Sequence, residues 1–181
     1  MPVGRLHYGA TAKTFHWAVA ALIAIQLPLG WLMPDIEPDT VPGVTISVHI
    51  SIGMSILALV VLRFLWRVLH PVAPESGLPA WQRISSEAVH WLLYLTVLAT
   101  TLSGWCFAST RGWTIYLYGV APLPRLVPKG SPLGDELGEL HEPLTWALLI
   151  LVAIHIAAAL VHLFVYRDRV MHRMLPGAGT I

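Results

Sequence analysis

The chain has 181 residues, of which 56% are hydrophobic and only 12% are charged, and its formal net charge at pH 7 is +1. This composition predicts an integral membrane protein. It offers no strongly basic surface, so no nucleic-acid partner is expected. The single cysteine, Cys106, excludes an internal disulfide framework.

Apolar residues fall in four blocks, each about 20 residues long, and each block is long enough for a helix to cross a hydrocarbon core of roughly 30 Å. The predicted spans are 14–33, 47–69, 87–108 and 141–166. The connection 109–140 is expected to be a long loop with glycine and proline throughout. We therefore expect an all-α integral membrane protein, a four-transmembrane-helix bundle forming one membrane domain over 1–181.

The first block could be mistaken for a signal peptide, because Arg5 and Lys13 precede it. It is too long for a typical apolar signal region, contains Gln26 and Pro28, and does not end at a small-residue cleavage site. We expect a retained first span.

Lysine and arginine are unevenly divided between the two ends of the predicted bundle. The end with both termini holds eight of them: Arg5, Lys13, Arg63, Arg67, Arg83, Arg167, Arg169 and Arg173. The other end holds three, Arg111, Arg125 and Lys129, together with seven acids: Asp35, Glu37, Asp39, Asp135, Glu136, Glu139 and Glu142. The positive-inside rule predicts that both termini are cytoplasmic, with the acidic end on the opposite, periplasmic side of the membrane.

The histidines of the spans fall at two depths. His49 and His141 begin the second and fourth spans, near the periplasmic side. The cytoplasmic layer holds four others: His16, His90, His155 and His162. Because His141 and His155 are 14 residues apart, they lie within about 40° of one helix face and about 21 Å apart along the axis.

An imidazole in hydrocarbon is costly unless it faces a partner, a water-filled cavity or a metal. Two layers of imidazoles suit two stacked b-type haems, each held non-covalently between two neutral histidines from different helices. In the outer layer His49 and His141 form the available pair, and in the inner layer His155 pairs with His16 or His90. The other histidines, His7, His70 and His172, are expected on the solvated surface.

Three glycines lie at related positions. Gly53 comes one turn after His49, whereas Gly30 and Gly104 lie 14 residues after His16 and His90, at the outer depth. Small residues there would let a flat macrocycle approach the helix backbones, although ordinary helix packing explains each glycine equally well.

Short motifs in order along the chain resemble the prokaryotic cytochrome b561 family. They are Thr14-Phe15-His16-Trp17, Val48-His49-Ile50-Ser51-Ile52-Gly53, Glu87-Ala88-Val89-His90, Arg111-Gly112-Trp113, Leu140-His141-Glu142, Ile154-His155 and Tyr166-Arg167-Asp168. The resemblance covers almost the whole chain. It implies a four-helix membrane cytochrome with two haem b groups that exchanges electrons with ubiquinone.

Carried over by position, the resemblance makes His49 and His141 the outer haem ligands and His16 and His155 the inner ones. His90 and His162 would then lie near haem propionates or a quinone. One departure concerns Pro143, which removes a backbone hydrogen bond soon after His141. The fourth helix is therefore expected to begin or kink there.

Three functions of different classes remain open. The resemblance suggests a superoxide oxidase that passes electrons to ubiquinone, with Arg111, Arg125 and Lys129 attracting the small anion. These charges could equally be interfacial. The acid-rich face instead favours a membrane-anchoring cytochrome for a periplasmic dehydrogenase or another redox protein. A haem-free transporter or proton relay is third, but the spans lack the acidic residues and broken helices that it would need.

Overall fold

The computed structural model describes residues 8–73 and 77–175. Four helical segments are long and apolar enough to cross a membrane: α1 (Ala10–Trp31), α2 (Val44–Leu69), α3 (Ala80–Thr110) and the segment Pro132–Tyr166. The last combines α4 (Pro132–Glu139), α5 (His141–Val161) and one π-helical turn, η1 (His162–Tyr166). The predicted all-α bundle of four transmembrane helices is confirmed. Arg5, counted on the cytoplasmic side, and His7, expected on the solvated surface, lie outside the described residues.

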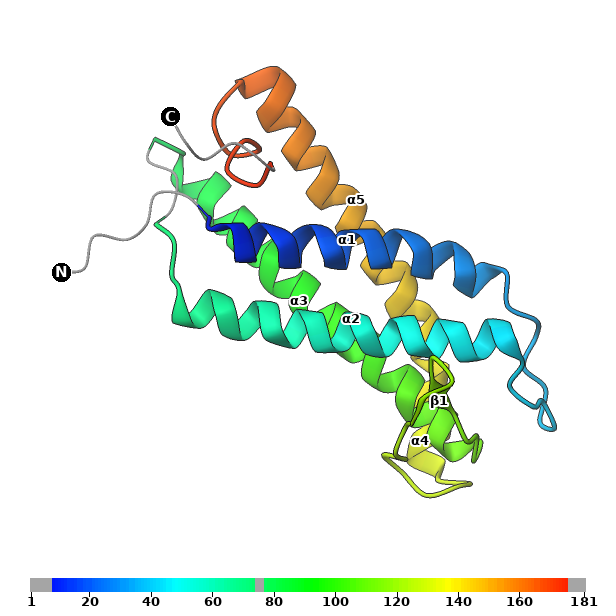
Figure 1. The fold of residues 1–181 in the computed structure, drawn as a ribbon. Helices are drawn as coiled ribbons and strands as arrows, with labels where there is room; N and C mark the ends of the chain where they lie inside the picture. The colour runs from blue at the N-terminus through cyan, green and yellow to red at the C-terminus, as the bar shows by residue number, and fades with distance from the viewer. Residues whose placement is uncertain (1–7, 74–76, 176–181) are drawn as a thin grey trace.

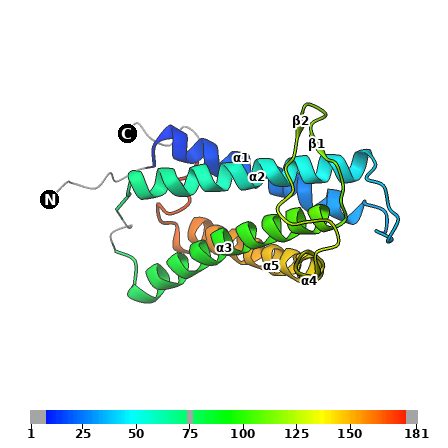
Figure 2. The same ribbon diagram turned by 90° about the horizontal axis from the view of Figure 1, so that it is seen from below.

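The four long helices are arranged in two layers. Helix α1 packs along α2, and α3 packs along α5, while α2 also contacts α3. Figure 2 shows α1 and α2 above and α3, α4 and α5 below, and Figure 1 shows the two pairs crossing at an angle. Any group held between the layers would therefore meet α1 or α2 on one side and α3 or α5 on the other.

A small apolar core fills the middle of the bundle. It consists of Val19, Ile56, Val60, Val97 and Leu148. Leu148 lies seven residues from both His141 and His155, about 10 Å along the helix axis from each. The core therefore separates two histidine depths, and large apolar side chains elsewhere on the helices are exposed, as lipid contact requires.

The prediction that all of 109–140 is a loop is wrong. Helix α3 continues to Thr110, a hairpin follows with strands β1 (Tyr116–Leu117) and β2 (Ala121–Pro122), and α4 occupies Pro132–Glu139. Glycine and proline suggested a loop, but Pro132 stands in the first turn of α4, where its missing N–H is harmless.

The glycines of α4 are explained by close packing against α3. A Cβ at Gly134 would lie 2.6 Å from the Cβ of Thr110, and one at Gly138 would overlap the ring of Phe107. Only glycine lets α4 approach α3 this closely. Since α5 follows α4 directly at Leu140, this packing also sets where α5 begins.

Helix α5 begins at His141, so Pro143 lies in its first turn. This position needs no intrahelical hydrogen bond to the proline nitrogen. At the other end, the π-helical turn stops at Arg167, which has a left-handed backbone (φ 52°). The chain then folds back, and Trp17 Nε1 and Lys13 Nζ donate to the carbonyls of Met174 and Leu175 at 2.8 and 2.9 Å.

Candidate functional site

One pair of histidines meets across the two layers at the end of the bundle where α2 and α5 begin. His49 comes from α2 and His141 from α5, and their ring centroids are 6.2 Å apart. The structure thus brings together the two residues that the sequence assigns to the outer layer.

Hydrogen bonds fix the His141 ring. Its Nδ1 lies 2.9 Å from the carbonyl oxygen of Thr100 and 3.2 Å from Ser103 Oγ, both on α3. A carbonyl oxygen only accepts, so Nδ1 carries the proton and donates it, and Nε2 keeps its lone pair. This is the tautomer that histidines adopt when Nε2 binds a metal and Nδ1–H is held by a backbone carbonyl.

The second cluster lies at the opposite end of the bundle and contains three rings. The His155 ring centroid is 6.1 Å from that of His16 and 5.2 Å from that of His90. His90 Nδ1 lies 2.7 Å from the Ser86 carbonyl oxygen, so it too is held as a donor. His16 belongs to α1 and faces His155 across the layers, whereas His90 belongs to α3, in the same layer as α5.

The histidine rings fit a haem iron. With metal–imidazole bonds of about 2 Å, two rings on opposite sides of one metal would have centroids roughly 6 Å apart, close to the 6.2 and 6.1 Å between the His49 and His141 rings and between the His16 and His155 rings. Among the described residues, none forms a hydrogen bond with the buried Nδ1 of His16 or of His49. The described residues also contain no cluster of three or more His, Cys, Asp or Glu side chains suited to a bare metal ion. A bis-histidine haem needs only two protein ligands.

Glycines make room for the imidazoles themselves. A Cβ at Gly104 would lie 2.8 Å from Cε1 of His141, and one at Gly30 would lie 3.4 Å from Cε1 of His49. The sequence leaves two explanations for both glycines, the approach of a macrocycle or ordinary helix packing. In the structure they are in contact with the histidine rings.

Gln26 is a site residue that the sequence argument missed. Its Nε2 donates to the backbone carbonyl of His49 at 2.9 Å, and a Cβ at Gly53 would lie 3.4 Å from that nitrogen. Gln26 and Gly30 are one turn apart on α1, and His49 and Gly53 are one turn apart on α2. The two residues on α1 contact the two on α2. A polar residue in an apolar span was the available signal.

The three predicted basic residues gather around Gly112. Arg125 Nη2 donates to the Gly112 carbonyl at 2.9 Å, and the Lys129 stem covers the Gly112 Cα, where a Cβ would lie 2.6 Å from Lys129 Cδ. Arg111 donates to the backbone carbonyl of Glu37 and lies over the Phe107 ring. Arg111 thus also joins the end of α3 to the connection between α1 and α2.

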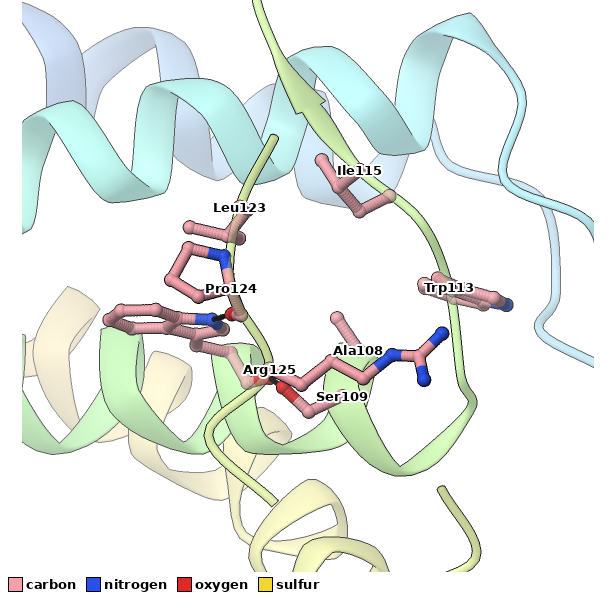
Figure 3. Close-up of a pocket in the computed structure, with 8 residues that line it drawn as sticks. Ala108, Ser109, Trp113, Ile115, Leu123, Pro124 and Arg125 are labelled. Carbon is pink, nitrogen blue, oxygen red and sulfur yellow. Dashed lines mark hydrogen bonds between the residues drawn. The ribbon is translucent and has the colours of Figure 1, made fainter. Parts of the chain in front are cut away.

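A small pocket adjoins this basic group. Figure 3 shows Trp113, Ile115 and Leu123 on the loop and Ala108 and Ser109 on α3 around it. Arg125 also lines it. Trp105 also lines the pocket, and its Nε1 donates to the Pro124 carbonyl at 2.8 Å.

His162 is placed apart from the ring cluster of His16, His90 and His155. Its Nδ1 lies 2.5 Å from Asp168 Oδ2, and its ring centroid is 5.3 Å from that of Tyr166. π-helical turns are frequent at functional sites, and here the turn begins at His162 itself.

The prediction that His70 is a solvated surface residue is wrong. Its ring stacks on that of Trp66, with the two ring centroids 3.9 Å apart, and the residue is only partly exposed. A tryptophan one turn earlier on α2 provides an apolar surface for the imidazole. His172 is exposed, as predicted.

Comparison with known proteins identifies the family. The family model described as prokaryotic cytochrome b561 matches residues 7–177. The chain belongs to the prokaryotic cytochrome b561 family. It is 31% identical to cytochrome b561 homolog 2 of Escherichia coli K12 over 172 residues, covering 93% of this chain and 90% of that protein.

Two other relatives cover most of the chain. The probable superoxide oxidase CybB of Yersinia pestis is 27% identical over 173 residues, covering 93% of this chain and 96% of that protein. Cytochrome b562 of Cereibacter sphaeroides is 24% identical over 170 residues, covering 90% of each. The protein is thus a multi-pass bacterial membrane protein of an electron-transfer family, and membership in this family implies b-type haem.

The contact between Gly104 and His141 yields a prediction. In Gly104→Ala the new methyl group overlaps the His141 ring, so the ring must shift, at about 1–3 kcal/mol of overpacking. We expect a lower haem-to-protein ratio and a shifted low-spin haem signal in electron paramagnetic resonance. Gly43→Ala is the control, because a Cβ at Gly43 meets nothing within 4 Å. Unchanged spectra and thermal stability in Gly104→Ala would contradict the placement of His141.

Proposed function

We propose that this chain is a two-haem cytochrome of the bacterial inner membrane that transfers electrons from a periplasmic donor, superoxide, to ubiquinone. The observation that carries the proposal is the pairing of His49 with His141 and of His16 with His155 across the helix layers, at ring distances of 6.2 and 6.1 Å. Bound haem b supplies one-electron redox chemistry at each pair. Both termini are cytoplasmic in this proposal, following the positive-inside rule.

The inner pair is His16 with His155 rather than His90 with His155. A planar group between two layers needs one ligand from each layer, and His90 and His155 belong to adjacent helices of the same layer. The centroids of the His90 and His155 rings are 5.2 Å apart, which is shorter than the roughly 6 Å expected for two imidazoles on opposite sides of one metal. His90 then lies beside the ligand pair, with Nδ1 held by Ser86.

Superoxide as the donor is supported by the relative from Yersinia pestis, whose name is probable superoxide oxidase. Two superoxide anions supply the two electrons, and two protons complete the reduction of ubiquinone to ubiquinol as dioxygen is released. Arg125 and Lys129 are exposed beside Gly112, where they would raise the local concentration of a small anion.

A membrane-anchoring electron-transfer subunit for a periplasmic dehydrogenase or other redox partner is the second candidate. The observation that favours it is the exposure of all seven acids at the same end of the bundle: Asp35, Glu37, Asp39, Asp135, Glu136, Glu139 and Glu142. They outnumber the three basic residues there, so the end as a whole suits a basic protein partner better than a free anion.

Quinone is expected at the end of the bundle that holds His16, His90 and His155. His162 lies at the same end and is not one of the proposed haem ligands, so its imidazole is available to bind a quinone. Its Nδ1 lies 2.5 Å from Oδ2 of Asp168. Such a pair can orient an imidazole toward a quinone oxygen and supply a proton to it.

The ligand pairs predict a pattern of haem loss. His49→Ala and His141→Ala should each remove the same haem, whereas His16→Ala and His155→Ala should each remove the other one, because each haem would lose one of the two histidines that would hold it. Pyridine haemochrome ratios and redox titration of the α-band measure this. His90→Ala is the matched control and should retain both haems; retention of both by His16→Ala instead would overturn the inner pairing.

Superoxide oxidation predicts a charge effect. In stopped-flow mixing with superoxide, Arg125→Gln and Lys129→Met should slow haem reduction and weaken its dependence on salt, because less attracting charge remains to be screened. Arg83→Gln neutralises an exposed charge at the opposite end of the bundle and should leave the rate of haem reduction and its salt dependence unchanged. Reduction no faster than with a generic reductant, and insensitive to both substitutions, would favour the partner-docked cytochrome.

The quinone site yields a separate prediction. His162→Ala should slow reoxidation of the reduced haems by ubiquinone while both haems stay bound, and Asp168→Asn should have a smaller effect in the same direction. His172→Ala removes an exposed histidine near the same end and serves as the control. Reoxidation at the wild-type rate in His162→Ala would remove His162 from the quinone site.

A further inference from the structure

The loop between Arg111 and Arg125 has an unusual composition for a connection between helices. No charged residue occurs from 112 to 124, and most side chains are apolar or aromatic: Trp113, Ile115, Tyr116, Leu117, Tyr118, Val120, Ala121 and Leu123. This loop carries the β1–β2 hairpin, and its two ends are marked by guanidinium groups. A segment with this pattern suits a lipid interface better than bulk water.

We propose that the β1–β2 hairpin is a membrane-dipping anchor, with its tip in the boundary between lipid headgroups and acyl chains beside α2. The first observation is its contact with a spanning helix. The Tyr118 N–H donates to Ser51 Oγ at 3.1 Å, and the Tyr118 hydroxyl is 2.7 Å from Ser55 Oγ. Both serines are on α2, so they set the level of the hairpin along that helix.

The level of Ser51 and Ser55 lies within the membrane-spanning part of α2. They follow Val44, the first residue of α2, by seven and 11 residues, which is about 10 and 16 Å along the axis. A hydrocarbon core needs about 20 residues of helix. A core that ends near Arg67 therefore begins before Ser51, and the hairpin tip cannot lie beside these serines without entering the lipid.

The position and exposure of the tip agree with lipid contact. Figure 2 shows the hairpin crossing α2 and projecting beyond it, away from α3 and α5. Tyr116, Tyr118 and Val120 are 51, 62 and 83% exposed. Tyrosine is enriched at membrane–water interfaces, where its ring contacts acyl chains and its hydroxyl stays near polar groups.

Backbone hydrogen bonds let the hairpin leave water. The Tyr118 N–H donates to the hydroxyl of Ser51. The N–H groups of Gly119, Val120 and Leu123 donate to the backbone carbonyls of Tyr116, Leu117 and Ile115, respectively. Pro122 and Pro124 carry no N–H at all. An unsatisfied backbone donor is costly in lipid, so these bonds to the hairpin's own carbonyls and to Ser51 on α2 favour its entry into the interface.

Cysteine labelling tests the anchor with a matched control. Val120→Cys and Val41→Cys are made in a Cys106→Ala background, because Val120 and Val41 are equally exposed at 83%. Val41 precedes α2 in the connection from α1. In haem-loaded protein in liposomes, a charged maleimide should label position 120 about tenfold more slowly than position 41, because thiolate formation is suppressed in lipid. After denaturation in detergent the two rates should be equal. Equal rates in liposomes would overturn the proposal.

A fluorescent label distinguishes lipid from a second copy of the chain. Bimane attached at position 120 should be quenched by phospholipids that carry a nitroxide on the upper acyl chain, more strongly than bimane at position 41. Slow maleimide labelling without such quenching, or ready formation of a disulfide-linked dimer by Val120→Cys, would assign the tip to a contact between copies and overturn the lipid assignment. Unchanged haem absorption in each variant verifies that it has folded.

Discussion

Imidazole groups inside hydrocarbon are the constraint on which this structure depends. Each must be compensated by a hydrogen bond, an aromatic contact or a metal, since water is absent. The fold meets this requirement by bringing His49 to His141 and His16 to His155 from opposite layers. The apolar core between the two levels keeps them apart, so a chain of only 181 residues holds histidine pairs at two different depths.

Small residues make this arrangement possible. Gly104 and Gly30 leave space for the rings of His141 and His49, and Gly134 and Gly138 let α4 lie against α3. Because α4 runs directly into α5, the packing of α4 helps to set the position of His141. A short helix in a connection thus contributes to the placement of His141 although it contains no histidine itself.

The two ends of the bundle differ in chemistry. One end carries exposed acids beside the basic group around Gly112, and its loop is tied to α2 through Tyr118. At the other end the C-terminal segment is fastened to α1 and to the α2–α3 connection, where Arg173 donates to the Ala73 carbonyl at 2.7 Å. The two ends therefore present different surfaces: exposed acids with a basic group at one end, and the attached C-terminal segment at the other.

Much of this was available from the sequence alone. Four apolar blocks of membrane-spanning length and the 14-residue spacing of His141 and His155 are local properties of the chain, and helix geometry converts them directly into spans and depths. The same geometry separated the histidines into two layers and left His155 with two possible partners. Tertiary structure supplied what helix periodicity cannot: which helices share a layer, so that His16 faces His155 while His90 lies beside it.

Tertiary structure also decided the details that depend on contacts between distant segments. Gln26 is a site residue because α1 packs against α2, which brings its side chain to the His49 carbonyl. Gly134 and Gly138 are compatible with helix α4 because they allow it to pack closely against α3. The stacking of His70 on Trp66 is likewise not predictable from the sequence, because the exposure of an imidazole depends on the rotamer that it adopts against its neighbours. Spacing along one helix is encoded locally by its 1.5 Å rise, whereas pairing across layers is a collective result of packing.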